Sequence, residues 1–349
     1  MAARFGLGFP WPYGAFSSFT PRKPKAEPSL SKVKLIFLDR VIELLKLVDF
    51  AKSEIRRENR TVFLCGGRID AASKTPASVR EALLRHVSSR EQIVGAQIIL
   101  AERATEALPG SNFTNLLDLE EYISAIVDGV ILIVESAGSI CELGAFVKTP
   151  EIRAKLIVLI SSIHDNSSSF IKLGALRYFE EGSGSDPEIS PFHWDFVDSG
   201  VSVQDYVLDD IVKELAGSLR RVRPKGRFKI SSLGDRIYLT LTICHLLRGA
   251  RLPEIKDCYE ALGLNDFEKE IIKHLSVLEI CKFIVPVSHG KKVKYFVPLI
   301  GSIPIRVAFN AGVEDRDRDT LRWINEISAQ IVAEEPARMR IFQEHQNVG

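Results

Sequence analysis

Between residues 61 and 160 the sequence alternates short apolar segments with helical patterns. Four segments have the length and apolar character of buried strands: Thr61–Leu64, Ala96–Leu100, Gly129–Val134 and Lys155–Ile160. Strands that are buried on both faces read as continuous apolar runs, and the helices between them supply the crossovers. The alternation therefore predicts an α/β domain with a parallel, Rossmann-like or flavodoxin-like sheet.

Length and composition are those of a soluble globular protein. The 349 residues are enough for two domains, and 46% of them are hydrophobic and 26% charged. No apolar run reaches the roughly 20 residues that span a bilayer. The five cysteines are odd in number and show no CxxC spacing. This disfavours zinc and a disulfide framework, and it favours a cytoplasmic location.

The later part of the chain is basic and has a different pattern. Residues 217–300 contain 16 Lys and Arg against 8 Asp and Glu, although the net charge of the whole chain is only +1. Three helical patterns are followed by two strand-like segments: Asp235–Leu247, Leu252–Leu262, Asp266–Leu278, Lys282–Val287 and Lys292–Pro298. This order predicts a winged helix-turn-helix.

We therefore expect four regions along the chain. Residues 1–31 combine Gly, Pro and Ser with scattered aromatic residues and predict a flexible arm. Residues 32–200 are expected to form the catalytic α/β domain, and residues 201–230 a helical and basic linker. Residues 231–349 are expected to form a winged-helix domain with a C-terminal helix.

The third predicted strand leads into the most informative motif. Small residues, Ser136 to Ser139, follow it and precede Glu142, which is expected near the first turn of a helix. A carboxylate at the carboxyl end of a parallel strand can act as a nucleophile toward an anomeric carbon that develops positive charge. Alternatively, Glu142 only interacts favourably with the helix dipole.

Further candidates lie in the segments between the predicted strands and helices. Cys65, Gly66 and Gly67 end the first strand and could admit a ribose or phosphate, or they could form an ordinary turn. Asp128 could hold a ribose hydroxyl or cap the preceding helix. Arg177 could pair with a phosphate or form a surface ion pair.

Basic side chains mark the predicted winged helix. Lys269 and Lys273 lie on its third helix, and Lys291, Lys292 and Lys294 lie in the wing. Lysine contacts with phosphates supply much of non-specific nucleic-acid affinity. A protein-binding winged helix with a solvated basic face is the alternative. The histidines show no metal spacing, and we expect no metal site.

Three segments together resemble nucleoside 2-deoxyribosyltransferase-like proteins. These are Thr61–Gly67, Ala125–Phe146 and Ser169–Arg177. More narrowly, the chain is similar to the effector subunits encoded with bacterial retrons, in which an N-glycosidase domain precedes a DNA-binding winged-helix domain. The resemblance covers about residues 60 to 180.

The resemblance implies roles for individual residues. Glu142 corresponds to the nucleophile of a Glu-Leu-Gly motif, and Asp128 to an acidic residue before the strand. From the sequence itself we expect the substrate-binding residues to be Cys65, Gly66, Gly67, Glu135, Ser136, Gly138, Ser139 and Arg177. Established transferases place an Asp six residues before the nucleophile, where this chain has Ser136. This departure leaves room for hydrolysis.

The resemblance also implies an activity and partners. Related retron effectors are toxins that split the N-glycosidic bond of NAD, and a reverse transcriptase with its branched RNA–DNA product (msDNA) restrains them until phage attack. NAD would be a substrate, and no cofactor is expected. The protein is expected to form a homo-oligomer or a higher assembly. Two alternatives stay open: a transferase or hydrolase of deoxynucleosides or nucleotides, and a non-enzymatic nucleic-acid-binding regulator.

Overall fold

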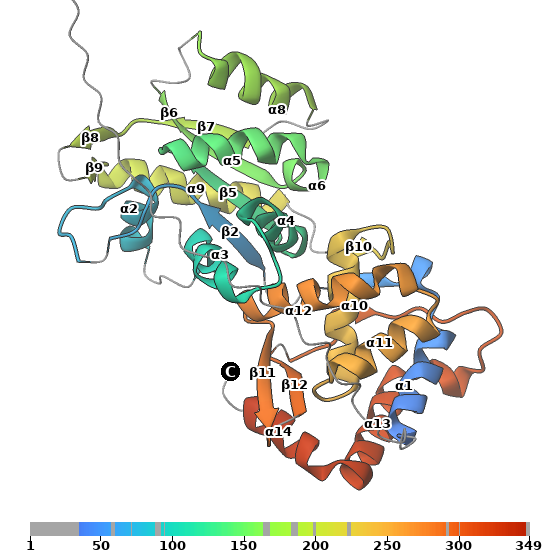
Figure 1. Ribbon diagram of the computed structural model, residues 1–349. Coiled ribbons are helices and arrows are strands. Elements are labelled where there is room, and N and C mark those ends of the chain that lie inside the picture. Colours follow the sequence, from blue (N-terminus) through green and yellow to red (C-terminus); the bar gives the residue numbers. More distant parts are fainter. Residues whose placement is uncertain are drawn as a thin grey trace, which may run out of the picture. The chain divides into compact units, whose positions relative to one another are not determined.

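The computed structural model (Figure 1) describes most of the chain after residue 34. The described ranges are 35–56, 60–70, 72–87, 92–93, 95–162, 168–182, 188–197, 200–221, 225–290, 293–299 and 301–346. The arm expected over residues 1–31 lies outside them. Leu35–Gly349 form one compact unit. No helix in these ranges combines the length and apolarity that crossing a membrane requires.

A six-stranded sheet forms the centre of the α/β part. Its spatial order is β3-β4-β2-β5-β6-β7, and all strands are parallel except the short edge strand β3. The strands are β2 Thr61–Cys65, β3 Gln92–Ile93, β4 Ala96–Leu100, β5 Gly129–Val134, β6 Leu156–Ser161 and β7 Glu188–Phe192. Among the parallel strands this is the 2-1-3-4-5 order of flavodoxin-like sheets. The predicted parallel α/β sheet is confirmed.

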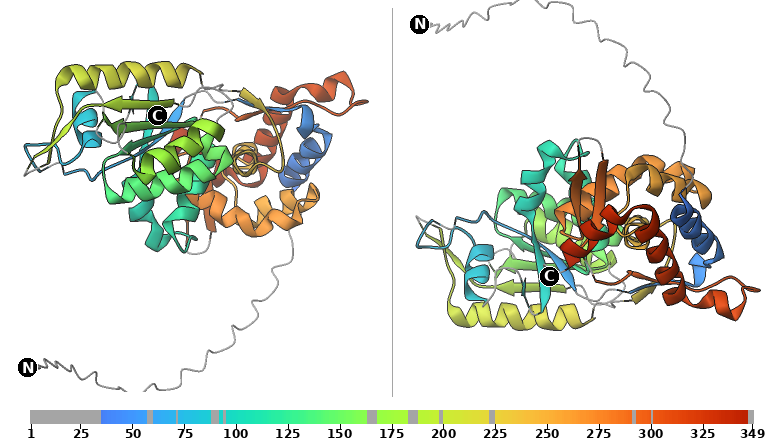
Figure 2. Two further views of the ribbon diagram at one scale, coloured as in Figure 1. Left: turned by 90° about the horizontal axis from the view of Figure 1, so that it is seen from above. Right: turned by 90° about the horizontal axis from the view of Figure 1, so that it is seen from below.

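Helices cover both faces of this sheet (Figure 2). One face packs against α2 Val79–His86 and α9 Asp205–Arg221, and the other against α3 Ala101–Ala107, α4 Leu116–Ile126 and α5 Ala137–Lys148. Successive residues of β2 alternate between the two cores, as the pleat requires. Because apolar residues of α9 complete one of these cores, α9 belongs to the α/β part and is not the linker expected over 201–230.

The later part contains three helices followed by a hairpin, in the predicted order. These elements are α10 Leu233–Leu246, α11 Leu252–Ala261, α12 Ile271–Ile280, β11 Ile284–His289 and β12 Val293–Pro298. A 3-10 turn, η4 Asn265–Glu270, precedes α12. Helix α10 is buried along almost its whole length, because α4, α11, α12 and β12 surround it.

The segment before β2 packs with the later part of the chain. Helix α1, Ile36–Leu47, contacts α11 and α13, Thr320–Glu334. The strand β1, Glu54–Arg56, pairs with β10, Lys225–Arg227, and with β13, Ile305–Arg306. The expected domain over 32–200 is therefore corrected: the apolar face of α1 is covered by helices that follow it by more than 200 residues.

Shorter elements complete the described chain. They are η1 Phe50–Lys52, η2 Leu108–Gly110, α6 Pro150–Arg153, the π-helical turn η3 Ile171–Leu176, α8 Arg177–Gly182, β8 Asp195–Val197, β9 Gly200–Ser202, η5 Asp315–Arg318 and α14 Pro336–Gln346.

Helices α4 and α10 meet without intervening side chains. A Cβ on Gly234 would lie 2.4 Å from the backbone oxygen of Ala125, so only glycine permits this approach. One turn further along α10, the hydroxyl of Tyr238 donates to the backbone oxygen of Ile126 at 2.7 Å. This contact joins the three-helix part to the α/β part.

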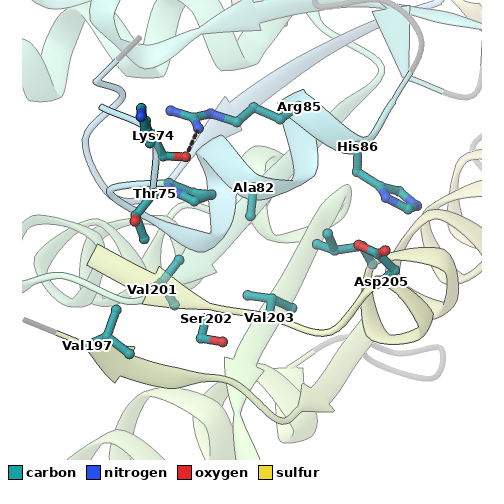
Figure 3. Close-up of a pocket in the computed structure, with 12 residues that line it drawn as sticks. Lys74, Thr75, Ala82, Arg85, His86, Val197, Val201, Ser202, Val203 and Asp205 are labelled. Carbon is teal, nitrogen blue, oxygen red and sulfur yellow. Dashed lines mark hydrogen bonds between the residues drawn. The ribbon is translucent and has the colours of Figure 1, made fainter. Parts of the chain in front are cut away.

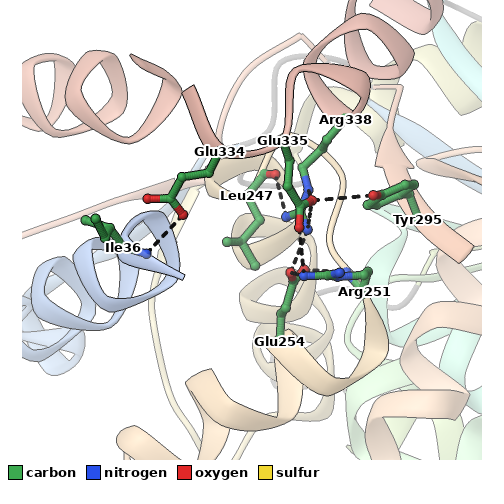
Figure 4. Close-up of polar contacts among 8 residues, drawn as sticks. All are labelled: Ile36, Leu247, Arg251, Glu254, Tyr295, Glu334, Glu335 and Arg338. Carbon is green, nitrogen blue, oxygen red and sulfur yellow. Dashed lines mark hydrogen bonds and ion pairs between the residues drawn. The ribbon is translucent and has the colours of Figure 1, made fainter. Parts of the chain in front are cut away.

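A buried ion network fastens α14 to α11 (Figure 4). The side chain of Arg338 is fully buried, and its NH2 atom lies 2.6 Å from Oε1 of Glu254 and 2.9 Å from Oε2 of Glu335. Arg251 pairs with both carboxylates as well. Each charge in the network thus has a partner of opposite sign, which offsets the cost of removing it from water.

Truncating the central arginine should destabilise the fold strongly. Arg338→Ala leaves Glu254 buried with less compensation, and we expect the free energy of unfolding to fall by about 3–5 kcal/mol in urea titrations. The double variant Arg338→Met with Glu254→Met should recover most of this loss, because it leaves no lone charge. A loss below about 1 kcal/mol for Arg338→Ala would contradict the assigned role.

Candidate active site

Glu135, directly after β5, organises the carboxyl edge of the sheet. Its carboxylate accepts hydrogen bonds from the backbone amides of Gly67 at 2.8 Å, Val79 at 2.5 Å and Arg80 at 3.1 Å. Val79 and Arg80 form the first turn of α2, so Glu135 occupies the position where a helix start attracts an anion. Burial raises the pKa of Glu135, while the three amides stabilise its charged form.

The glycine pair after β2 serves this internal contact. A Cβ on Gly67 would lie 2.6 Å from Cβ of Ser78, and one on Gly66 would lie 3.0 Å from Oε1 of Glu135. The amide of Gly67 already donates to Glu135. The expectation that Gly66 and Gly67 admit a phosphate is therefore corrected: these glycines allow the protein to approach itself.

Ser136 and Ser139 are used in a helix cap. Ser136 is the N-cap of α5, its hydroxyl accepts from the amide of Ser139 at 3.1 Å, and the hydroxyl of Ser139 accepts from the amide of Ser136 at 2.9 Å. Both hydroxyls thus satisfy the backbone amides at the start of α5. The helix begins at Ala137, earlier than expected, which places Glu142 in the second turn. Gly138 lies exposed in the first turn.

Glu142 projects from α5 toward the end of β2. Its Oε2 atom is buried and has no hydrogen-bond partner among the described residues. Burial raises the pKa of Glu142, the guanidinium of Arg80 opposes this rise, and the charge of Glu102 adds to it. The thiol of the fully buried Cys65 lies close enough for the charge of Glu142 to raise its pKa further, beyond the effect of burial.

Glu120, on α4, is a second carboxyl group beside Glu142. It is only 5% exposed, and no hydrogen bond or ion pair joins it to another described residue. Burial, followed by the charge of Glu142, raises the pKa of Glu120 to about 8. A carboxyl group that keeps its proton near neutral pH beside a second carboxyl group is typical of a general acid.

Arg80 and Glu102 complete the group. Arg80 is 2% exposed. Its Nη1 atom donates to the backbone oxygen of Leu64 at 3.2 Å, and its Nη2 atom donates to Oε1 of Glu102. Nε of Arg80 and Oε2 of Glu102 are buried without partners among the described residues. We call Arg80, Glu102, Glu120 and Glu142 the acidic cluster.

The acidic cluster lies at the switch point of the sheet. Strand β2 has β4 on one side and β5 on the other, and the chain leaves β2 and β5 toward opposite sides of the strand order. In doubly wound sheets, ligands bind in the crevice at the carboxyl ends of the strands at this point. Sequence reasoning found Glu142 but missed the other three residues, since their burial depends on how α2, α3 and α4 pack.

Two predicted residues lie elsewhere. Asp128 precedes β5 and is 1% exposed, and its Oδ2 atom accepts from the amide of Thr61 at 2.8 Å. The six residues of β5, about 20 Å, separate it from the carboxyl edge. The expectation that Asp128 orients a ribose beside Glu142 is therefore corrected to a structural role. Arg177, which is exposed, forms a surface ion pair with Glu181 at 3.3 Å.

A hollow of about 750 Å³ opens on the α2 face of the sheet (Figure 3). None of the predicted site residues lines it. Its Arg85 already donates to the backbone oxygen of Lys74 at 2.8 Å and to Glu81. We place the candidate site at the acidic cluster instead, because three carboxyl groups lie close together there, and Glu102 and Glu142 each have a buried oxygen without a partner among the described residues.

Comparison with known proteins identifies the family. Residues 76–286, more than half of the chain, match the family model of the STM3845 retron effector protein. The chain belongs to this family. An Escherichia coli relative named "Retron Ec73 putative ribosyltransferase/DNA-binding protein" is 26% identical over 243 residues, which cover 64% of this chain and 73% of the relative. The similarly named retron Ec86 protein of Escherichia coli is 26% identical over 271 residues, covering 74% and 82%.

In this retron effector, one side of α12 contacts the α/β part. Nζ of Lys273 lies 5.2 Å from the ring centroid of Phe113 and 5.5 Å from that of Tyr122. On the same helix, Ser276 accepts a hydrogen bond from Asn112 at 3.0 Å. Lys273 is thus half-buried against two aromatic rings of the α/β part, and its expected contact with nucleic acid stays a prediction.

The other lysines that were predicted to contact nucleic acid lie on η4 and in the hairpin segment. Lys269, on η4, is exposed. Nζ of Lys294, on β12, lies 5.2 Å from the ring centroid of Phe296. Lys291 and Lys292 lie outside the described residues.

Removing the Glu135 carboxylate should destabilise the retron effector. Glu135→Ala leaves three amides at the carboxyl edge without their acceptor, and we expect the free energy of unfolding to fall by about 2–4 kcal/mol. Urea titration followed by circular dichroism measures this. Glu180→Ala, at an exposed position of α8, is the matched control and should change it by less than about 0.5 kcal/mol. Equal effects of the two variants would refute the role given to Glu135.

Proposed function

We propose that this retron effector cleaves the N-glycosidic bond of a nucleotide, with NAD as the first candidate. The observation that carries the proposal is the half-buried Glu142, whose Oε2 atom is buried without a hydrogen-bond partner among the described residues, at the switch point of a flavodoxin-like sheet. A carboxylate in this position can stabilise or trap a ribose carbon that develops oxocarbenium character.

The reaction follows from the charges of the acidic cluster. The ionised Glu142 attacks C1′ of the ribose, its oxygen forms a bond to that carbon, and the bond from C1′ to the base nitrogen breaks. From NAD, nicotinamide leaves as a neutral base and needs no proton. Water then attacks C1′, the bond from C1′ to the Glu142 oxygen breaks, and one proton of the water passes to solvent, which leaves a free ribose hydroxyl and an ionised Glu142. Arg80 lowers the pKa of Glu142 and so favours the ionised nucleophile.

Glu120 favours a second candidate, the hydrolysis of nucleosides or nucleotides with purine or pyrimidine bases. These bases leave as anions unless they receive a proton. With a pKa of about 8, Glu120 holds a proton near neutral pH and can donate it to such a base. Because Ser136 is used as a helix cap, where established transferases carry an Asp, we favour hydrolysis over transfer in both cases.

The biological role is proposed on the basis of the family. As a retron effector, the protein is expected to act with the retron reverse transcriptase and msDNA. We propose that this complex restrains a cytoplasmic toxin, assembled as a homo-oligomer, and that phage attack releases it and causes abortive infection. The three helices and the β11–β12 hairpin would form a winged helix-turn-helix that binds nucleic acid, in keeping with the relatives that are named DNA-binding.

Replacing the nucleophile should abolish base release. Purified wild type should release nicotinamide from NAD, and Glu142→Gln should lower the rate at least a thousandfold, because the amide cannot form the glycosyl ester. Chromatography of free base with NAD, dAMP and deoxynucleosides in parallel reads the outcome. Glu151→Gln, a surface variant with the same loss of charge, should keep full activity.

Other results would exclude the proposal. Unchanged release by Glu142→Gln would sink the assignment of the nucleophile. If the wild type releases no base, and if Glu142→Gln is as toxic on expression as the wild type, the non-enzymatic regulator is the better explanation.

The two substrate classes should differ in their pH dependence. Glu142 must be ionised, so both rates should fall as the pH drops through its raised pKa. Glu120 must be protonated only for purine or pyrimidine release, so that rate alone should also fall as the pH rises through about 8. Rates from pH 5 to 9 with NAD and dAMP test this. Glu120→Gln should spare nicotinamide release and remove the alkaline limb; identical profiles would contradict the role of Glu120.

A further inference from the structure

The small sheet β10-β1-β13 brings together three segments that lie far apart in the sequence. Glu54 in the central strand is paired with Arg227 on one side and with Arg306 on the other. Directly opposed residues project from the same face of a sheet, as do residues two apart in one strand. Arg56, Arg227 and Arg306 therefore share one face with Glu54.

Burial distinguishes the two faces of this sheet. Ile55 and Ile305 are each 3% exposed and pack into the core. Arg56, Arg227 and Arg306 are exposed. We call these three arginines the arginine face; Lys229, two residues beyond β10, is also exposed.

The arginine face carries unneutralised charge. None of its three guanidinium groups forms an ion pair or a side-chain hydrogen bond with a described residue. Glu54 is the single carboxylate among them in the register. Three guanidinium groups thus share one carboxylate, and a net positive charge remains on this face. A bound polyanion would neutralise it, and guanidinium groups match phosphate oxygens in a bidentate geometry.

We infer that the arginine face binds the phosphate backbone of a nucleic acid. The inference rests on the nucleic-acid partner in the proposed function, and it moves the contact away from α12, whose Lys273 is covered by Phe113 and Tyr122. The extended, regularly charged phosphate backbone is the occupant that fits three arginines spread over adjacent strands. An acidic protein segment is the competing outcome.

The test removes the charges without reversing them. Arg56→Gln, Arg227→Gln and Arg306→Gln are combined in the full chain, and binding of a fluorescein-labelled 20-base-pair DNA duplex and of an RNA–DNA hybrid is followed by anisotropy between 50 and 300 mM salt. We expect affinity to fall about tenfold or more at 100 mM salt. The slope of log affinity against log salt should fall by about 3, since each lost phosphate contact contributes about 0.9.

The matched control removes three exposed charges elsewhere: Lys213→Gln, Arg316→Gln and Arg340→Gln. This variant has the same net charge and should keep at least half of the wild-type affinity and the full salt slope. Unfolding of both triple variants in urea checks the fold. Equal losses in the two triple variants would overturn the inference, since net charge alone would then explain them.

A third variant separates the inference from the function that it rests on. If Lys269→Gln with Lys294→Gln weakens binding and the arginine triple does not, the nucleic acid binds at η4 and the hairpin, and the inference is overturned while the proposed partner stands. If the wild type binds neither the DNA duplex nor the RNA–DNA hybrid, both the inference and the proposed nucleic-acid partner fail. If the wild type binds polyglutamate through the arginine face but neither nucleic acid, the partner is an acidic protein segment.

Discussion

The arrangement of the carboxyl edge depends on one carboxylate, that of Glu135. It lies at the end of β5 and accepts from the loop after β2 and from the first turn of α2. These bonds fix the start of α2 and therefore the position from which Arg80 reaches Leu64 and Glu102. The electrostatic environment of Glu142 thus follows from a hydrogen-bonded carboxylate that itself has no part in the proposed chemistry.

Local patterns predicted the elements well, and long-range packing decided the rest. Four of the six strands of the sheet, the three later helices and the hairpin follow from periodicity, which depends on neighbouring residues alone; the edge strands β3 and β7 were not predicted. The packing partners of α1 and α9 could not be predicted from periodicity, because an apolar helical face does not determine which surface covers it. In the site, Glu142 could be predicted from the loop before it. Glu120 could not, since its burial is created by helices that meet only in the folded chain.

The exposed basic side chains are distributed differently from what the sequence suggests. The basic region predicted a nucleic-acid surface on the third helix and the wing, yet the side of α12 that carries Lys273 and Ser276 contacts Phe113, Tyr122 and Asn112. The exposed arginines instead come from three strands, two of which lie outside residues 217–300. Charge counted along a sequence therefore locates a basic region but not a basic surface.

Helix α4 has almost no side that is free to vary. Glu120 belongs to the acidic cluster. Tyr122 contacts Lys273 and His274 of α12. The backbone at Ala125 and Ile126 contacts α10. Substitutions within α4 would consequently need compensating changes in α5, α10 or α12. Across the family, these helices should change together over evolutionary time, with independent drift restricted to exposed positions such as Leu117.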